Sequence, residues 1–582
     1  MSLVARRTWF DHLKLWIARR QGGIATRRFN AAIGNATAVQ DELFDQLVRR
    51  GPQGDYQRDH GFDRIRSYED YAAALPIQRY ADIAPYIERV RQGEVGALFD
   101  RETRILMFAL TSGTTAEPKY IPITQSVLEH WREGWSVWGL RALVDHQGCF
   151  LRGIVQVTSP MKDHLAPGGA PCGAITGLLA AKQRRLVRRY YTAPLAVAGI
   201  RDAAAKYYTI MRMSIDRDVA FMVTASPATL LLLAKSADDH REQMIRDIHD
   251  GTLWSQLAIS PETRAALAPR LRAQPDTARR LERLAAEHGG LYPRHYWQLG
   301  FLAHWTGGTM GLYLPLLKKY FGDAPSRDIG LLASEGRLSI PVDDGTASGV
   351  LNVRSHFFEF IPAEDYGADR PTVLRTHQLE AGREYFVLLT NGSGLYRYDL
   401  GDRVRVTGRM GQAPMIEFLS RDAHTSSMTG EKLTEDQVVS AMRGIPEASQ
   451  LALDFILAPR FGELPRYRLY LEAGEHGISP DLAQRFDAAL CKTNVEYAGK
   501  RESGRLGPVQ LAELVPGTLA QRDRRLRESR SRTGEQFKHQ YLLPRPGLDS
   551  DLDAAMVPLK RVVPVPKEPA GRIGSPQLAD GY

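Results

Sequence analysis

The segment that most constrains the fold of this chain is residues 111–119, which reads Thr-Ser-Gly-Thr-Thr-Ala-Glu-Pro-Lys. It follows an apolar run at 104–110 that has the length of a buried strand. Thr124, shortly after it, can cap the N-terminus of a helix. The sequence therefore predicts a strand, a loop of small residues and then a helix. Backbone N–H groups around Gly113 can point toward an anion, and the hydroxyl groups add donors, so the loop is suited to holding phosphates.

Two interpretations of this loop stay open at this point. Lys119 would add a mobile positive charge for a triphosphate, although the spacing differs from the Walker pattern Gly-x-x-x-x-Gly-Lys-Ser/Thr. Turns rich in Ser, Thr and Gly are also common, and an ordinary turn of this kind needs no ligand.

The size and charge of the chain limit the classes of function. It has 582 residues, of which 43% are apolar and 25% charged, as in soluble globular proteins. The formal charge of +9 favours anionic ligands but does not require nucleic acid. Cys149, Cys172 and Cys491 are far apart, so neither a disulfide framework nor a zinc site is predicted. No stretch approaches the ~20 apolar residues of a membrane span, and no secretory signal is evident; we expect a cytoplasmic protein.

The order of apolar and turn segments predicts the fold class. Strands and helices alternate at first, which favours α/β layers: a strand at 295–300, a small-residue turn at 305–310, a helix at 311–320 and a short strand at 329–335. After residue 345 the helices stop. The following strands predict a small antiparallel sheet or β-barrel: 349–353, 356–361, 384–390, 395–398 and 402–406.

The remainder of the chain forms a second unit. We expect α/β layers and the small barrel in a large N-terminal domain, residues 1–420, and a hinge at the polar segment 421–425. A smaller, mobile α+β domain would cover 426–548. Residues 549–582 contain several prolines and little amphipathic order, so we expect a mobile tail.

Three charged residues outside the loop also suit nucleotide chemistry. Glu335 follows a short apolar strand and could hold Mg²⁺ while the ion bridges phosphates. Asp402 could accept hydrogen bonds from two ribose hydroxyls. Lys538 could stabilise negative charge that develops around phosphorus. Each has a plainer interpretation: an acid at a helix start, a turn aspartate and a surface lysine.

Two further features are weaker. Glu431 and Lys432 follow the expected hinge, and their plainer interpretation is a solvent-exposed pair of opposite charges. Trp131, Trp135 and Trp138 lie on one side of the helix after the loop, where aromatic residues are usually part of the core. They could also line an apolar substrate pocket.

The order of these motifs resembles that of the adenylate-forming superfamily, which includes firefly luciferase and acyl-activating enzymes. Closer details resemble its auxin-responsive Gretchen Hagen family of acyl acid–amido synthetases, over residues 40–548. The segments that carry the closer resemblance are 56–62, 75–80, 306–310, 357–362, Asn494 with Tyr497 and Arg501, and 517–518 before 536–538. Thr111 stands where the family usually has Ser.

The resemblance implies a role for each matching residue. The residues assigned to the phosphates are Thr111, Ser112, Gly113, Thr114, Thr115 and Lys119. Ser334, Glu335 and Lys432 are expected near the α-phosphate, and Glu335 is also expected to bind Mg²⁺. Those assigned to the rest of the nucleotide and the hinge are Asp402, Phe418 and Arg421, and Lys538 is the catalytic lysine. Those assigned to the acyl substrate are Trp138, Thr306, Gly307, Thr309 and Met310.

The activity that follows from the resemblance is ATP-dependent formation of an acyl-AMP from a small carboxylic acid, then transfer of the acyl group to an amine, which we expect to be an amino acid. An acyl-CoA synthetase is an alternative within the superfamily. A nucleic-acid-binding protein is another, because basic runs occur at 184–189 and 522–532, but their interspersed acids and lack of aromatic residues favour solvated surface. We expect a monomer or weak dimer that binds neither nucleic acid nor membrane.

Overall fold

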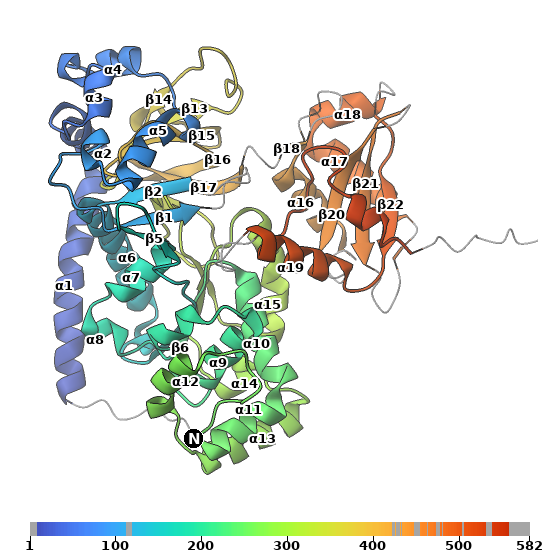
Figure 1. Cartoon of the computed structure of the whole chain (residues 1–582). Helices are drawn as coiled ribbons and strands as arrows, with labels where there is room; N and C mark the ends of the chain where they lie inside the picture. Colours follow the sequence, from blue (N-terminus) through green and yellow to red (C-terminus); the bar gives the residue numbers. More distant parts are fainter. Residues whose placement is uncertain are drawn as a thin grey trace, which may run out of the picture.

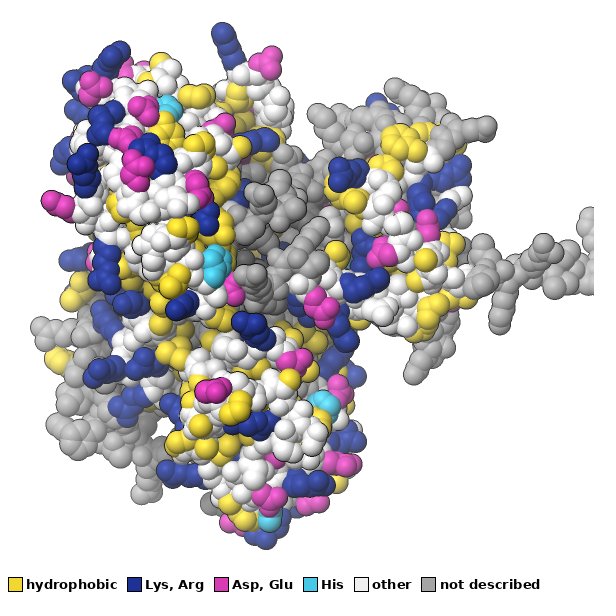
Figure 2. Space-filling view, viewed as in Figure 1, with side chains coloured by type: hydrophobic (Ala, Val, Ile, Leu, Met, Phe, Trp, Pro, Cys, Tyr) yellow, Lys and Arg dark blue, Asp and Glu magenta, His cyan; other side chains and the backbone are white. Residues whose placement is uncertain are grey.

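The structure is a computed structural model, and it describes most of the chain in two lobes. The described residues are 9–111, 119–421, 425–426, 431, 433–446, 454–461, 464–472, 478–479, 481–502, 506–530 and 538–557. The larger lobe ends with β17 (Ala413–Arg421), and the smaller lobe, orange and red in Figure 1, begins with β18 (Thr425–Ser426). Figure 2 shows charged side chains of both signs scattered over one face. None of the described helices has the length and apolarity needed to cross a membrane.

A parallel four-stranded sheet lies in the core of the larger lobe, in the order β3-β6-β7-β8. Its strands are β3 (Gly153–Gln156), β6 (Val219–Val223), β7 (Phe301–His304) and β8 (Ser326–Asp328). All four residues of β7 are buried, as expected for a strand of a covered parallel sheet. The carboxyl ends of the strands therefore meet at one edge, which is where open α/β sheets bind ligands.

Helices pack around this sheet. Leu230 and Leu233 of α10 and Leu317 of α15 join Met222 and Leu302 of the strands in one hydrophobic cluster. The helices of this region are α7 (Ile175–Ala181), α8 (Arg185–Arg188), α9 (Ala203–Arg212), α10 (Pro227–Asp239), α11 (Arg241–Asp250), α12 (Pro261–Leu267), α13 (Pro275–His288), α14 (Pro293–Tyr296) and α15 (Leu314–Phe321). The strand expected at 295–300 is wrong: Pro293 begins the short helix α14, and the buried run that forms a strand starts at Phe301.

A second sheet contains the strands on either side of residues 112–118. β1 (Met107–Thr111) and β2 (Lys119–Ile123) pair antiparallel, and Thr111 lies opposite Lys119. The expected strand and helix are confirmed, because α6 (Gln125–Asp145) follows and the Thr124 side chain accepts a hydrogen bond from the backbone N–H of Val127. Lys119, however, begins a second strand, which buries Ile121 and Ile123. The sheet continues with β5 (Pro171–Gly173) and β4 (His164–Leu165).

The third sheet is antiparallel and has seven described strands, in the order β11-β12-β17-β16-β15-β13-β14. They are β11 (Ser339–Ile340), β12 (Gly349–Leu351), β13 (Phe357–Pro362), β14 (Leu374–Arg375), β15 (Glu384–Asn391), β16 (Leu395–Met410) and β17. Among the described residues, the edge strands β11 and β14 do not pair with each other, so hydrogen bonds do not close this sheet into a barrel. The expected antiparallel sheet is confirmed.

N-terminal helices cover the larger lobe, and a buried ion pair attaches one of them to the third sheet. Arg397 Nε lies 3.1 Å from Glu359 Oε1, and Arg397 Nη1 donates to the carbonyl oxygens of Ala72 and Leu75 at 3.0 and 2.7 Å. Tyr68 donates to the same carboxylate at 2.8 Å. The helices are α1 (Trp9–Gly34), α2 (Ala36–Phe44), α3 (Asp55–Asp59), α4 (Tyr68–Ala74) and α5 (Tyr80–Arg91).

The smaller lobe is α+β. Its sheet has the order β20-β21-β22. The elements are β19 (Leu433–Thr434), α16 (Glu435–Arg443), β20 (Phe455–Arg460), β21 (Arg466–Glu472), α17 (Leu482–Thr493), α18 (Val495–Glu502), β22 (Gln510–Leu514), α19 (Thr518–Arg530) and α20 (Ser550–Asp553). The expected fold class, α/β followed by α+β, is confirmed.

Residues 549–557, which the sequence assigned to a mobile tail, are packed instead. Leu552 is buried in a cluster with Ile456 and Tyr470, and Tyr470 donates a hydrogen bond to Asp549 at 2.9 Å. The apolar positions that make this contact extend over less than three turns, so they do not stand out as an amphipathic segment. Residues 558–582 lie outside the described part of the chain.

Replacing Arg397 by Met should destabilise the larger lobe by about 3 kcal/mol or more, because it leaves the buried Glu359 carboxylate without its positively charged partner. Arg405→Met is the matched control on the same strand, since Arg405 is 40% exposed and its ion pairs should contribute about 1 kcal/mol or less. Chemical denaturation followed by tryptophan fluorescence measures both. Equal losses in the two variants would contradict this prediction.

Candidate active site

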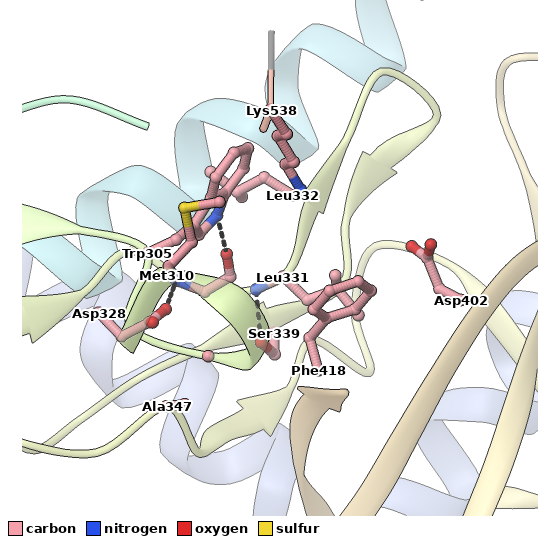
Figure 3. Close-up of a pocket in the computed structure, with 12 residues that line it drawn as sticks. Trp305, Met310, Asp328, Leu331, Leu332, Ser339, Ala347, Asp402, Phe418 and Lys538 are labelled. Carbon is pink, nitrogen blue, oxygen red and sulfur yellow. Dashed lines mark hydrogen bonds between the residues drawn. The ribbon is translucent and has the colours of Figure 1, made fainter. Parts of the chain in front are cut away.

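A cavity of about 570 Å³, open to solvent, lies where the edge of the parallel sheet, the antiparallel sheet and the smaller lobe meet (Figure 3). Three groups of residues line it. The parallel sheet and the segments after it contribute Trp305, Gly307, Met310, Asp328, Gly330, Leu331 and Leu332; the antiparallel sheet and its connections contribute Ser339, Ala347, Asp402 and Phe418; the smaller lobe contributes Lys538.

Hydrogen bonds between the ends of β7 and β8 fix the floor of the cavity. One carboxylate oxygen of Asp328 accepts from the backbone N–H and the hydroxyl of Thr306 at 2.6 and 2.7 Å. The other accepts from the N–H of Gly330 at 2.6 Å. Trp305 Nε1 donates to the Gly330 carbonyl at 2.9 Å. The indole ring of Trp305 is therefore held against the cavity by contacts on both strands.

Burial changes the charge balance of this floor. It raises the pKa of the Asp328 carboxyl to about 6, and hydrogen bonds from Gly330 and Thr306 and the charge of Arg337 limit the rise. Arg337 is itself buried, which lowers its pKa to about 9. Its guanidinium lies 4.5 Å from the centroid of a Trp135 ring. The floor thus combines a carboxylate and a cation that are both shielded from water.

A glycine turn allows the antiparallel sheet to approach this floor. A Cβ atom on Gly307 would lie 3.2 Å from the carbonyl oxygen of Phe418, and one on Gly308 would lie 2.9 Å from that of Leu419. Gly308 also has φ of +55°, which favours glycine. The turn leads into η7 (Gly308–Tyr313) and places Phe418 opposite Trp305 across the cavity.

Lys538 reaches the cavity from the smaller lobe. Its Nζ lies 4.6 Å from the centroid of the Trp305 ring and 5.5 Å from that of Phe418, within the range of cation–π attraction. Asp402 faces the same cavity from the opposite side (Figure 3). Arg443 joins the lobes nearby, since its Nη2 donates to the Gly308 carbonyl at 2.8 Å. Two lobes therefore bring opposite charges to one space.

Ser334 and Glu335 lie at the start of the small-residue loop. Ser334 Oγ is 3.5 Å from the Leu110 carbonyl oxygen on β1, and the Glu335 carbonyl accepts from Asn391 Nδ2 at 2.8 Å. Both Ser334 and Glu335 are buried. The Ser334 hydroxyl therefore lies next to the end of β1, and Glu335 is the next residue along the chain.

Several expected site residues cannot be compared with this geometry. Ser112, Gly113, Thr114, Thr115 and Lys432 lie outside the described residues. For three others only the backbone is described: Thr111 ends β1, Thr309 lies in η7, and Arg421 is paired with Asp402 at the end of β17.

Five expected site residues whose side chains the structure describes do not line the cavity: Lys119, Trp138, Thr306, Ser334 and Glu335. Lys119 Nζ is 3.4 Å from Tyr398 Oη and 5.6 Å from the centroid of the Tyr80 ring. Trp138 is buried in the core, where its Nε1 donates to the Asp328 carbonyl at 2.8 Å. Trp138 therefore helps to fix Asp328 in the floor of the cavity, as Thr306 does through its two hydrogen bonds to the Asp328 carboxylate.

The lining residues that the sequence reasoning missed are Trp305, Asp328, Gly330, Leu331, Leu332, Ser339 and Ala347. Trp305 is the first residue after β7, and Asp328 is the last residue of β8. Because β7 was predicted at the wrong residues, the sequence did not show that these two residues lie at the ends of neighbouring strands. Among the described residues, no group of three or more His, Cys, Asp and Glu side chains could hold a metal ion by itself.

Comparison with known proteins assigns the chain to a family. Three family models match it: the GH3 family N-terminal domain at residues 25–326, the central domain at 349–421 and the C-terminal domain at 436–546. This chain belongs to the GH3 family. The resemblance found in the sequence is thereby confirmed.

Curated relatives within the GH3 family match most of the chain. Indole-3-acetic acid-amido synthetase GH3.8 of Oryza sativa subsp. indica is 24% identical, over 86% of this chain and 88% of its own length. Jasmonoyl–L-amino acid synthetase JAR4 of Nicotiana attenuata is 24% identical, over 84% and 88%. The solved structure of AtGH3.15 acyl acid amido synthetase in complex with 2,4-DB covers 92% of this chain and 96% of its own, with a TM-score of 0.81 and 20% identity, which shows a shared fold.

Asp328 should make stability depend on pH in the mildly acidic range. Its pKa in the folded protein, about 6, lies above the ordinary 3.8, so its stabilising contribution is present at low pH and lost as the pH rises through 6. The stability of Asp328→Asn relative to the unsubstituted protein should therefore rise by roughly 3 kcal/mol between pH 4 and 7. Denaturation midpoints measure this. Asp276→Asn, at a side chain 94% exposed, is the control, and parallel pH curves for both would contradict the prediction.

Proposed function

We propose that this chain is an ATP-dependent acyl acid–amido synthetase. In the first step, a carboxylate oxygen of the acid attacks the α-phosphorus of ATP, and the bond to the bridging oxygen breaks with release of pyrophosphate. In the second step, an amine attacks the acyl carbon of the mixed anhydride, AMP leaves, and the amine loses a proton. The observation that carries the proposal is the convergence of Lys538, Asp402 and the Trp305–Phe418 pair on one cavity in a GH3 family chain.

The cavity supports a division of roles in the first step. Trp305 and Phe418 offer aromatic faces for a nucleobase, and Asp402 offers acceptors for ribose hydroxyls. Lys538 would neutralise charge that develops on the reacting phosphate, which a preorganised cation does efficiently where water is excluded. Carboxylates are poor acylating agents, so the enzyme would act mainly by positioning the acid and ATP.

Glu335 is the residue that would hold Mg²⁺. The ion usually binds one or two carboxylates and fills its other positions with water and substrate phosphates. A single buried carboxylate, one residue after Ser334, whose hydroxyl contacts the end of β1, fits it. When bound, Mg²⁺ would neutralise phosphate charge. Ser334 and the loop residues 111–115 would orient the phosphates from the same side.

The second step needs an amine, which we propose to be an amino acid, as the name of JAR4 says of that enzyme. Rotation of the smaller lobe about residues 421–425 would withdraw Lys538 and let the amine reach the acyl-AMP. The domain limits 1–420 and 426–548 remain proposals, with the packed residues 549–557 added to the second. We also propose a cytoplasmic enzyme that is a monomer or weak dimer and acts on small molecules alone.

Lys538→Ala should lower acid-dependent exchange between ATP and labelled pyrophosphate by about 100-fold or more, because the charge it removes acts on the reacting phosphate. ATP binding, measured by calorimetry, should survive. Lys492→Ala, at an exposed lysine of α17 in the same lobe, is the control and should leave exchange unchanged. Exchange in Lys538→Ala equal to that in the control would refute this role.

A panel of indole-3-acetate, jasmonate and 2,4-DB tests the substrate class. Pyrophosphate release with one of these acids, followed by mass spectrometry with pooled amino acids, should detect an amide without coenzyme A. A thioester formed only with coenzyme A would instead support an acyl-CoA synthetase. Failure of every acid to stimulate pyrophosphate release would contradict the proposed reaction for this substrate class.

A further inference from the structure

His539, the residue after Lys538, is held by both of its ring nitrogens. Nδ1 lies 2.8 Å from Asp523 Oδ2 on α19, and Nε2 lies 3.1 Å from the Phe455 carbonyl oxygen at the start of β20. A carbonyl oxygen and an ionised carboxylate can only accept hydrogen bonds, so both nitrogens must carry protons. The side chain is 6% exposed. The geometry therefore describes a buried imidazolium that ties a helix to a strand.

The charges around His539 agree with this protonation state. Burial by itself would lower its pKa, but the hydrogen bond and charge of Asp523, the charge of Asp454 and the Phe455 carbonyl together raise it to about 9. The Tyr541 ring lies 4.5 Å away on the same segment. From the larger lobe, Lys235 of α10 lies near Asp454, and Tyr313 of η7 lies near both Asp454 and Asp523. Within the smaller lobe, Glu472 lies near Asp454 and Arg527 of α19 lies near Tyr313.

The backbone just after His539 is fixed as well. Tyr541 N–H donates to Glu435 Oε1 on α16 at 2.6 Å, and the Tyr541 carbonyl accepts from the Leu457 N–H at 2.8 Å. Consecutive Cα atoms are only 3.8 Å apart. Anchors one and three residues beyond Lys538 therefore determine where its side chain starts and the direction in which it can extend.

We propose that the His539–Asp523 pair is a positioning element that directs Lys538 into the cavity, although neither residue touches the substrates. The inference rests on the proposed function, in which Lys538 serves the first step only. Loss of the pair should then impair formation of the acyl-AMP and leave transfer of the acyl group to the amine intact. A pair that merely stabilised the smaller lobe would affect both steps or neither.

The activity test compares His539→Gln and Asp523→Asn with the unsubstituted protein. ATP–pyrophosphate exchange is measured with the acid that releases most pyrophosphate in the panel above, and the second step with that acid's synthetic acyl-AMP and pooled amino acids. His539→Gln should lower kcat for exchange by about 10- to 100-fold, with KM for ATP and the second step unchanged. Asp523→Asn removes the carboxylate that favours the charged form of His539. The pH at which exchange activity falls on the alkaline side should therefore be lower by about one pH unit or more.

His146→Gln is the matched control. His146 also contacts a carboxylate, with Nε2 2.7 Å from Asp344 Oδ2, but it lies after α6 in the larger lobe. It should leave both steps and the pH profile unchanged. Exchange in His539→Gln equal to that of the control, or equal losses in both steps, would overturn the proposal.

A readout without catalysis separates this inference from the proposed function. Ring NMR of protein labelled with ¹⁵N-histidine identifies His539 by the signals that His539→Gln lacks. Both nitrogens should stay protonated through neutral pH and titrate near 9. Titration near the ordinary value of 6.5 would overturn the inference even if exchange is active. If no acid in the panel supports exchange, the proposed reaction fails for that panel, and the NMR titration still decides whether the charged pair exists.

Discussion

The approach of the Lys538 amine to two aromatic rings of the other lobe is the interaction on which the rest of this structure depends. The lysine comes from the smaller lobe, and the rings of Trp305 and Phe418 come from two different sheets of the larger lobe. Each sheet must end in the right place for the three to meet. The hydrogen bonds of Asp328 fix the segments after β7 and β8, and the glycine turn at 307–308 lets the antiparallel sheet approach them closely.

Buried polar groups make this arrangement specific. Asp328, Arg337 and His539 are all shielded from water, and each would be costly to bury without partners. The hydrogen-bond partners of Asp328 and His539 come from other strands, helices or loops, so a shift of these segments would leave those two charges unsatisfied. The same principle attaches α4 to the antiparallel sheet through Arg397 and Glu359. These buried charges therefore fix the relative positions of the segments that form the cavity and its surroundings.

The sequence alone predicts this site in part, and the physical reasons differ from residue to residue. Asp402, Phe418 and Lys538 belong to motifs with a fixed order, so their convergence could be inferred from resemblance. The strand before residue 111 and the cap at Thr124 follow from local patterns. Trp305 and Asp328 were missed because periodicity placed a strand at 295–300, whereas burial of Phe301–His304 decides its real position. The strand that begins at Lys119 was not predicted, because it is stabilised by pairing with β1, which no local pattern shows.

The central claim is that one nucleotide occupies the space between the two lobes. A crystal structure with the α,β-methylene analogue of ATP and Mg²⁺ tests it most directly. We expect density for the base against the Trp305 and Phe418 rings, the ribose at Asp402, and the phosphates between Lys538 and the Ser334–Glu335 side. Nucleotide density outside this cavity, or with Asp402 and Lys538 facing separate spaces, would contradict it.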